Sequence, residues 1–177
     1  VEGAGQGLDW GRIHIFWVDE RYVPADSKMS NFKLAADTFL KLVDIPEENI
    51  HRIPTEYQDI KVAERDYEDD IRRTFRLQQG QYPEFDLVVL GMGQDGHTAS
   101  LFPGNFATFE DSDLVSAVYV LDDKLNRITM TPAVLKRALH IAILVGGSEQ
   151  AETLKDVLSS EPDEVKYPIH ILCPVLD

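Results

Sequence analysis

The sequence predicts an α/β protein, residues 1–177 forming a single domain in which a mostly parallel, Rossmann-like sheet is flanked by helices. Short apolar runs alternate with longer amphipathic stretches through most of the chain, as in strand–helix–strand units with right-handed crossovers. Two of these runs, residues 85–90 and 139–145, are continuously apolar, which is typical of strands buried on both faces of a parallel sheet. No repeat, low-complexity segment or interdomain linker interrupts the pattern.

The predicted strands are short segments rich in β-branched and aromatic residues. Residues 13–18 form the first strand, and residues 50–53 form a shorter second one. After the strand at 85–90, residues 114–121 and 127–130 are expected to form a hairpin or two separate strands. Residues 139–145 form a further strand, and the apolar run 169–173 is expected to be the last.

Helices are predicted where apolar side chains recur every three or four residues. Residues 31–42 show this spacing, and residues 57–79 place five apolar side chains on one face of a long charged helix: Ile60, Ala63, Tyr67, Ile71 and Phe75. Thr131 is expected to open a helix, because Pro132 then takes the first helical position, where its missing N–H costs no hydrogen bond. Residues 149–158 form the last predicted helix.

The composition is that of a globular protein with a marked acidic excess. The formal net charge of −14 disfavours nucleic-acid binding, which needs a basic surface, and an anionic substrate would have to be held by local cations and backbone N–H groups. No apolar run approaches the roughly 18 residues of a membrane helix, so no membrane partner is expected. The single cysteine, Cys173, fits a reducing, cytoplasmic location. We expect a monomer or weak homodimer.

Polar side chains follow two of the predicted strands at the point where each strand ends. Asp19, Glu20 and Arg21 come directly after residues 13–18, and a glycine-rich segment, residues 91–98, comes directly after residues 85–90. Because ligand sites in open parallel sheets form beyond the carboxyl ends of the strands, we expect both clusters on the same rim. The second cluster also satisfies G-x-G-x-x-G, but the proline and glycine at positions 103–104 cut short the helix that a dinucleotide site needs.

His97 is the histidine best placed for chemistry, since it lies in the glycine-flanked loop with Asp95 two residues away. An imidazole can take a proton from water near neutral pH. His14, His140 and His170 lie in or beside apolar runs and are expected to be structural, whereas His51 has no nearby group of polar partners in the sequence.

Other kinds of catalytic site find little support. The chain lacks H-x-x-x-H, a cysteine pair and a compact set of histidine and carboxylate ligands, so neither a metal nor another cofactor is expected. Ser100 lies near His97, but no G-x-S-x-G elbow surrounds it. Arg21 could stabilise developing oxyanion charge or hold a carboxylate or phosphate, and Arg127 is a further candidate cation.

Three motifs, in order along the chain, resemble the signatures of the 6-phosphogluconolactonase family. Residues 85–104, FDLVVLGMGQDGHTASLFPG, are similar to its long and specific signature. Residues 18–24, VDERYVP, with Ser30 and Asn31 after them, resemble a second, and residues 127–132, RITMTP, resemble a weaker third. The related glucosamine-6-phosphate deaminases share the G-x-D-G-H core, but a Phe-Asn-Glu-Pro-like segment follows it, where this chain has TASLFP at residues 98–103.

The resemblance implies hydrolysis of 6-phospho-D-glucono-1,5-lactone to 6-phosphogluconate in the oxidative pentose phosphate pathway, with this sugar phosphate lactone as the binding partner. It also implies that the chain lacks the family's N-terminal strand and phosphate loop and its C-terminal end, and that Gln150 stands near a position where the family tends to have lysine. The implied catalytic residues are His97 as general base, Asp95 to orient it, and Arg21. The implied substrate-binding residues are Asp19, Glu20, Gly93, Gly96, Thr98 and Arg127.

Three alternatives remain open from the sequence. The first is a glucosamine-6-phosphate deaminase or isomerase, which would release ammonia from its substrate. The second is a non-catalytic module that binds sugar phosphates. The third is a dinucleotide-binding oxidoreductase, which would bind NADP.

Overall fold

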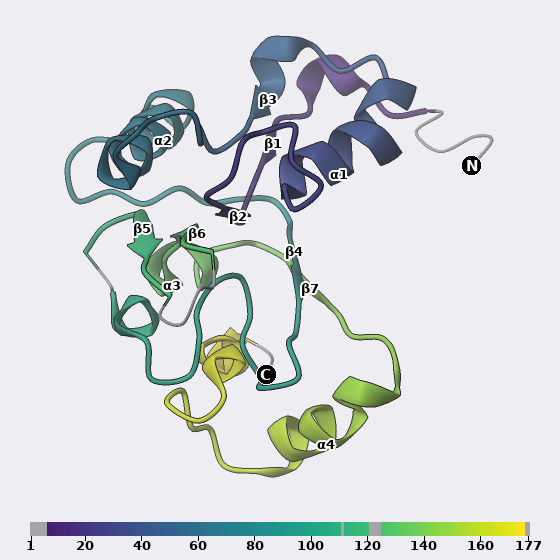
Figure 1. Ribbon diagram of the computed structural model, residues 1–177, viewed down its shortest axis with the longest axis vertical. Coiled ribbons are helices and arrows are strands. Elements are labelled where there is room, and N and C mark those ends of the chain that lie inside the picture. The colour runs from purple at the N-terminus through teal and green to yellow at the C-terminus, as the bar shows by residue number, and fades with distance from the viewer. Residues whose placement is uncertain (1–6, 111, 121–124, 176–177) are drawn as a thin grey trace.

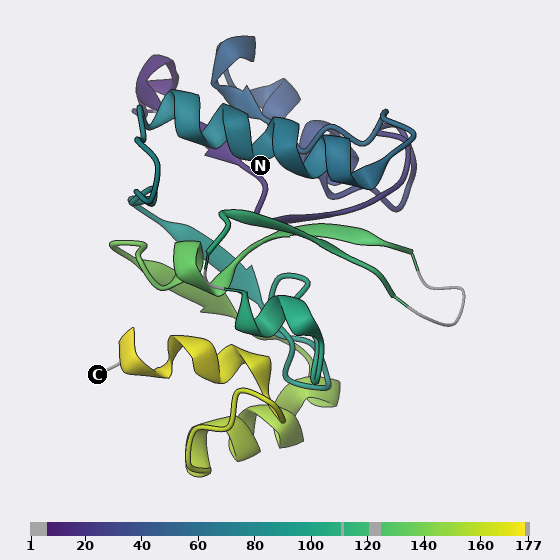
Figure 2. The same cartoon turned by 90° about the vertical axis from the view of Figure 1, so that its left-hand side faces the viewer.

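The computed structural model describes residues 7–110, 112–120 and 125–175. Its elements are arranged in layers (Figures 1 and 2). The helices α1 (Asn31–Thr38) and α2 (Ile60–Thr74) lie at one end of the molecule, and α4 (Ala151–Ser159) lies at the other with the C-terminal segment. The strands run between them, which confirms the predicted α/β class with helices flanking the strands.

Two pairs of strands are parallel, as predicted. The strand β1 (Ile15–Phe16) pairs with β3 (Ile50–His51), and β4 (Val88–Gly91) pairs with β7 (Ile141–Leu144). Leu90 lies opposite Ile143 in the second pair, so the carboxyl ends of β4 and β7 face the same way. The polar loop that follows β4 therefore starts at a shared sheet edge.

A third sheet is antiparallel. It contains β2 (Asp19–Arg21), β6 (Arg127–Met130) and β5 (Val115–Val118), in the order β2–β6–β5. Of the two alternatives for residues 114–121 and 127–130, a hairpin or two separate strands, the structure has the paired arrangement, since β5 pairs with β6, although residues 121–124 lie outside the described residues. The segment after β1 is more regular than expected, since Asp19, Glu20 and Arg21 form a strand of their own, opposite Thr129, Ile128 and Arg127.

The four predicted helices are present, but α1 and α2 are shorter than the predicted ranges 31–42 and 57–79. In α2 the buried residues are Ile60, Ala63, Tyr67 and Ile71, the face that the sequence predicts, and the Tyr67 hydroxyl donates to the carbonyl of Trp17 at 2.8 Å. Thr131 precedes α3 (Pro132–Leu135), as expected. Short 3-10 helices occupy Trp10–Arg12, Leu40–Leu42, Glu47–Asn49, Phe106–Phe109 and Ser148–Gln150. Among the described residues, no helix combines the length and apolar character needed to cross a bilayer.

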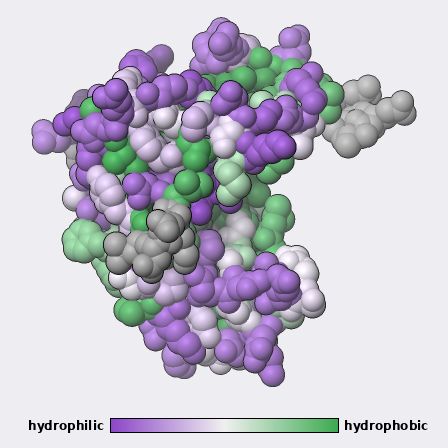
Figure 3. Space-filling model, in the orientation of Figure 1, coloured by the Kyte–Doolittle hydropathy of each residue, from purple (hydrophilic) through white to green (hydrophobic). Residues whose placement is uncertain are grey.

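The expectation that residues 85–90 and 139–145 are buried on both faces is wrong for this chain. In β4, Val88 and Leu90 are buried while Val89 is 51% exposed. In β7 every residue keeps some exposure, and Leu144 is 67% exposed. One face of this pair therefore meets solvent, although both strands are continuously apolar. Figure 3 shows green, apolar surface within a hollow on one side of a largely hydrophilic molecule.

The predicted last strand, residues 169–173, is also wrong, because Pro168–Val175 forms a 3-10 helix. Pro168 has no N–H to donate to a strand ladder. The Ile169 N–H donates to the carbonyl of Gly96, and the His170 N–H donates to that of Tyr167. The apolar run is buried against the loop after β4, and contacts from distant parts of the chain decide its conformation.

Candidate functional site

The loop after β4 places a hydrogen-bonded imidazole and carboxylate at the sheet edge. Nδ1 of His97 lies 2.6 Å from Oδ1 of Asp95, and the same oxygen accepts the His97 backbone N–H at 3.1 Å. Since an ionised carboxylate only accepts hydrogen bonds, Nδ1 carries the proton and the lone pair of the neutral ring lies on Nε2. The His97 side chain is 30% exposed, so water can approach it.

Two glycines allow this loop to close tightly. A Cβ on Gly93 would overlap the His97 ring and lie 2.9 Å from Oδ1 of Asp95. Gly96 has a φ of +77°, and a Cβ there would lie 2.6 Å from the ring of Tyr167. Gly93 thus makes room for the imidazole, and Gly96 combines a left-handed turn with close packing.

Asp95 is held in its charged form. Burial alone would raise its pKa, but the hydrogen bonds from the ring and backbone of His97 outweigh burial and lower the pKa of Asp95 below its ordinary value. A charged carboxylate on Nδ1 stabilises the imidazolium that forms when Nε2 takes a proton. The Asp95–His97 pair therefore has the arrangement that a general base requires.

Arg21 projects into the same cavity from β2. Its Nη1 donates to the carbonyl of Met29 and to Oδ1 of Asn31, each at 3.0 Å, and Nδ2 of Asn31 donates to the backbone carbonyl of Asp19 at 3.0 Å. Among the described residues, the buried Nε of Arg21 has no hydrogen-bond partner. The bonds from Nη1 thus fix the guanidinium in the lining of the cavity, where its charge can pair with an anionic group of a ligand.

The register of β2 against β6 brings a second guanidinium beside the first. Arg21 is directly opposite Arg127 in this antiparallel pair. Burial lowers the pKa of Arg127, and the positive charge of Arg21 lowers it further. Two arginines at this spacing repel each other unless an anion lies nearby, which makes the pair suited to a phosphate or an oxyanion.

Asp19 is an acidic residue that lines the same cavity as the two arginines. Its Oδ2 accepts a hydrogen bond of 2.6 Å from the hydroxyl of Ser100. Burial raises the pKa of Asp19, opposed by the Ser100 hydrogen bond and by the charges of Arg127 and Arg21. Ser100 is itself fully buried, so the turn after His97 is tied directly to β2.

These residues share one cavity of about 280 Å³, whose lining includes Asp19, Arg21, Asn31, Gly93, His97 and Arg127. The two predicted clusters therefore do meet on one rim. Asp95 stands behind His97 and outside this lining. Within the described ranges, no group of three or more His, Cys, Asp or Glu side chains is arranged to hold a metal ion.

Three residues expected to contact substrate are not among those that line the cavity. The Glu20 carboxylate is buried and accepts hydrogen bonds from the Ser30 hydroxyl and from the backbone N–H groups of Asn31 and Phe32 at the start of α1. Thr98 is fully buried, and its hydroxyl donates to the carbonyl of Gly91 at 2.9 Å. Gly96, the third, packs against Tyr167.

The sequence reasoning missed Asn31, Ser100 and Phe102 as parts of the site. Asn31 orients Arg21 and Ser100 binds Asp19, while the ring of Phe102 lies 4.7 Å from the His97 ring. All three lie within the quoted motifs, but their partners are distant in sequence or reached through a tight turn. Spacing along the chain does not reveal such contacts.

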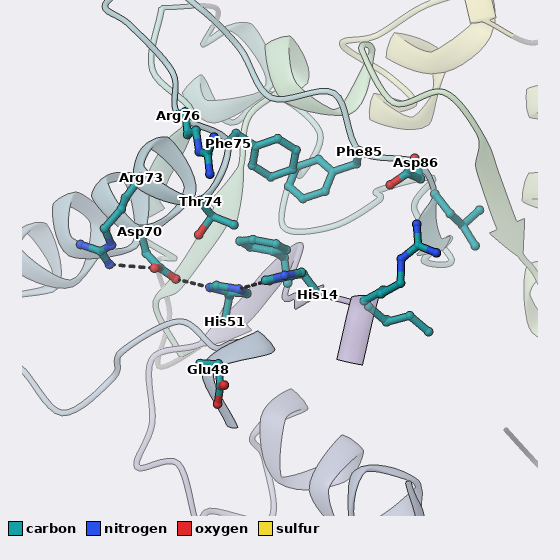
Figure 4. A pocket seen from close by; sticks show the side chains of 14 residues that line it. His14, Glu48, His51, Asp70, Arg73, Thr74, Phe75, Arg76, Phe85 and Asp86 are labelled. Carbon is teal, nitrogen blue, oxygen red and sulfur yellow. Dashed lines mark hydrogen bonds and ion pairs between the residues drawn. The ribbon is translucent and has the colours of Figure 1, made fainter. Parts of the chain in front are cut away.

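His51 also differs from expectation, because it belongs to a second polar group near the amino ends of β1 and β4 (Figure 4). Its Nδ1 lies 2.7 Å from Oδ2 of Asp70, and its Nε2 lies 3.0 Å from Nδ1 of His14. The Phe16 ring stacks on the His51 ring at 4.1 Å. Asp70 comes from α2, so the sequence around His51 gives no sign of this group.

Comparison with known proteins agrees with the motifs. Residues 2–175 match the family of glucosamine-6-phosphate isomerases and 6-phosphogluconolactonases. The chain is 39% identical to a 6-phosphogluconolactonase of Synechocystis sp. over 171 residues, which cover 97% of this chain and 70% of the relative. It is 36% identical to a 6-phosphogluconolactonase of Thermotoga maritima over 165 residues, covering 90% of this chain and 68% of the relative.

Solved structures show the same fold. A crystal structure of 6-phosphogluconolactonase from Thermotoga maritima superposes with a TM-score of 0.77 at 35% identity, covering 93% of this chain and 69% of that one. A monomeric glucosamine-6-phosphate deaminase has a TM-score of 0.77 at 18% identity, covering 96% of this chain and 71% of that one, a similarity of fold alone. The chain belongs to the glucosamine-6-phosphate isomerase/6-phosphogluconolactonase family.

Proposed function

We propose that this protein hydrolyses 6-phospho-D-glucono-1,5-lactone to 6-phosphogluconate in the oxidative pentose phosphate pathway. One observation carries the proposal: a His97 ring whose Nδ1 is engaged by Asp95 shares a cavity of about 280 Å³ with the guanidinium groups of Arg21 and Arg127. A proton acceptor beside two cations is what hydrolysis of an anionic ester requires.

In the proposed reaction, Nε2 of His97 takes a proton from water while the water oxygen bonds to the lactone carbonyl carbon. The carbonyl oxygen becomes an oxyanion, and the guanidinium of Arg21, which lines the same cavity as His97, stabilises it. The bond from the carbonyl carbon to the ring oxygen then breaks. The ring oxygen accepts the proton from the His97 imidazolium and leaves as a hydroxyl, and the new carboxylic acid ionises.

Binding falls to the remaining groups of the cavity. Arg127 binds the phosphate, and Asp19 keeps the two guanidinium groups in place and accepts from a sugar hydroxyl. Because Gly93 has no side chain, the lactone ring can approach His97 closely. A chain with a net charge of −14 repels a phosphorylated substrate at long range, so these local cations carry its recognition. Glu20, Gly96 and Thr98 support this arrangement without contacting substrate.

A product assay tests the proposal. We expect the intact protein to convert the lactone to 6-phosphogluconate faster than the spontaneous reaction and to release no ammonia from glucosamine 6-phosphate. The variant His97→Gln should lose about 10² to 10⁴ in turnover, the usual contribution of a general base. His140→Gln is a matched control, since His140 is exposed and its Nδ1 contacts the backbone carbonyl of Asp86. Full turnover in His97→Gln would refute the assignment.

We further propose that the protein acts in the cytosol as a monomer or weak homodimer, without a cofactor. The half-buried single cysteine, Cys173, is compatible with a reducing compartment. Among the relatives, one from Arabidopsis thaliana is a chloroplastic 6-phosphogluconolactonase. Sedimentation across micromolar concentrations would test the assembly state, and fractionation of the source cells would test the compartment.

A further inference from the structure

Phe102 connects the two halves of the candidate site. Its ring centroid lies 4.7 Å from that of His97, with the two planes at 45°. The guanidinium carbon of Arg127 lies over the same ring, 5.9 Å from its centroid. Phe102 is half-buried and is separated from Arg127 by 25 positions in the sequence. One aromatic side chain thus contacts both the proposed base and the proposed phosphate ligand.

A tight turn fixes the place of this ring. Ala99 has a φ of +52°, and the Leu101 N–H donates to the carbonyl of Thr98 at 3.0 Å, which reverses the chain just after His97. The Phe102 carbonyl accepts hydrogen bonds from the Asn105 N–H at 3.0 Å and the Thr108 hydroxyl at 3.1 Å. Because backbone bonds hold Phe102 on both sides, its ring can serve as a fixed surface for its two neighbours.

Both neighbours need such a surface. The hydrogen bond to Asp95 fixes one ring nitrogen of His97 but leaves the tilt of the ring free. The Arg127 side chain donates from Nε to the carbonyl of Leu125 at 3.3 Å, a long hydrogen bond that holds its head weakly. A ring contact removes the remaining freedom of each group, and the negative face of an aromatic ring attracts a cation.

We propose that Phe102 is a positioning residue that holds the His97 ring and the Arg127 head in one shared geometry, so that base and phosphate ligand are aligned together. The inference rests on the proposed lactone hydrolysis. It predicts that loss of the ring changes both kinetic constants, kcat through His97 and KM through Arg127. A purely structural role would lower the fraction of active protein, which reduces kcat and leaves KM unchanged.

The kinetic test compares Phe102→Leu with Phe102→Tyr in the intact protein. We expect the Leu variant to lose about 10-fold in kcat/KM, with kcat lower and KM higher, since ring–ring and ring–cation contacts of this kind each contribute a few-fold. The Tyr variant keeps the ring and should stay within about twofold of the unsubstituted protein. Phe106→Leu is the matched control, because Phe106 lies in the same segment and is 80% exposed.

Two further measurements separate this role from others. In an Arg127→Met background, Phe102→Leu should add no further rise in KM, because Phe102 acts on KM through Arg127. In NMR spectra, the His97 ring protons should move when the Phe102 ring current is lost in the Leu variant, and stay in place in the Tyr variant. If Leu prevents folding, Phe102→Met replaces it as the variant without a ring.

The outcomes are distinct from those that test the function itself. Loss of turnover in His97→Gln with an unchanged KM in Phe102→Leu supports the function and overturns this inference. The inference is also overturned if the His97 ring-proton signals do not move in Phe102→Leu, or if Phe102→Tyr loses as much kcat/KM as Phe102→Leu. If no lactone hydrolysis is found, the function fails, and titration of 6-phosphogluconate into the Leu and Tyr variants still decides whether Phe102 supports binding through Arg127.

Discussion

The protein contains two hydrogen-bonded Asp–His pairs beside different cavities, and only one has the features of an active site. In the loop after β4, Nδ1 of His97 lies 2.6 Å from Asp95, and His97 lines a cavity of about 280 Å³. In the other pair, Nδ1 of His51 at the end of β3 lies 2.7 Å from Asp70, beside a larger hollow of about 930 Å³. The size of the hollow and the presence of such a pair therefore do not by themselves identify a site.

The two histidines differ in what is left for a ligand. Both ring nitrogens of His51 are engaged, by Asp70 and by His14, and Phe16 stacks on its face, so the ring is 8% exposed. Among the described residues, no hydrogen bond engages Nε2 of His97. The free ring nitrogen of His97 faces an open cavity and can accept a proton from water. The ring of His51 has no free nitrogen and instead links β3 to α2 and to the residue before β1.

The charges around the two pairs differ as well. In Figure 4 the Arg73 head points to Asp70, and the two side chains bond at 2.8 Å, so this cation is neutralised within the group. At the His97 cavity, Arg21 and Arg127 form part of the lining together with Asp19. Both guanidinium groups are thus available for an anionic ligand there.

The largest expected contrast comes from removing the carboxylate of each pair. Asp95→Asn should lower kcat about 10²-fold, because the imidazolium formed on His97 loses its counter-charge. Asp70→Asn should leave kcat within about twofold and reduce the free energy of unfolding by about 1 kcal/mol through loss of a buried hydrogen bond. Steady-state kinetics and urea unfolding measure the two effects. If Asp70→Asn lowered kcat as much as Asp95→Asn, the conclusion that only the Asp95–His97 pair acts in turnover would be wrong.

A glycine substitution gives the next largest effect. In Gly93→Ala the new methyl group would overlap the His97 ring and lie 2.9 Å from Oδ1 of Asp95, so the pair must move. A displacement of this kind should lower kcat about 10-fold or more. Gly146→Ala is the control, since a Cβ there meets no atom within 4 Å and its φ is not positive. Equal kcat values in the two variants would show that the position of His97 is not important.

Much of the fold could be predicted because its patterns are local. The apolar face of α2 and the start of α3 at Pro132 follow from spacing and from the chemistry of single residues. The 3-10 helix Pro168–Val175 could not be predicted as such, since an apolar run is compatible with any buried conformation. Its hydrogen bond to Gly96 is a tertiary contact that outweighs the strand preference of the sequence.

The site was predictable to the extent that its residues lie in one loop or at a strand end. His97, Asp95 and Arg21 follow from such positions. The pairing of Arg127 with Arg21 depends on the register of β2 against β6, and the Ser100–Asp19 hydrogen bond joins residues 81 positions apart. The resemblance implied that Glu20 binds substrate, but alternation along β2 turns its side chain inward to the start of α1.

The smallest expected effect concerns Asp19 and extends the comparison to pH. Burial raises the pKa of Asp19 above its ordinary value of 3.8, so between 3.8 and the higher folded value the native state binds more protons than the unfolded state. The free energy of unfolding must then fall as pH rises through this window. Replacing Asp19 with Asn removes this contribution. We expect the free energy of unfolding of the variant to rise relative to that of the unsubstituted protein as pH rises above 4.

Urea unfolding at a series of pH values between 4 and 7 measures this difference. Asp69→Asn, at an exposed position of α2, corrects for the loss of one carboxylate. The two Asn variants should diverge in that range, with Asp19→Asn improving relative to Asp69→Asn as the pH increases. The opposite trend would mean that Arg21 and Arg127 outweigh burial and favour the charged form of Asp19. In that case the cavity would be closer to electrical neutrality and would offer less net positive charge to an anionic ligand.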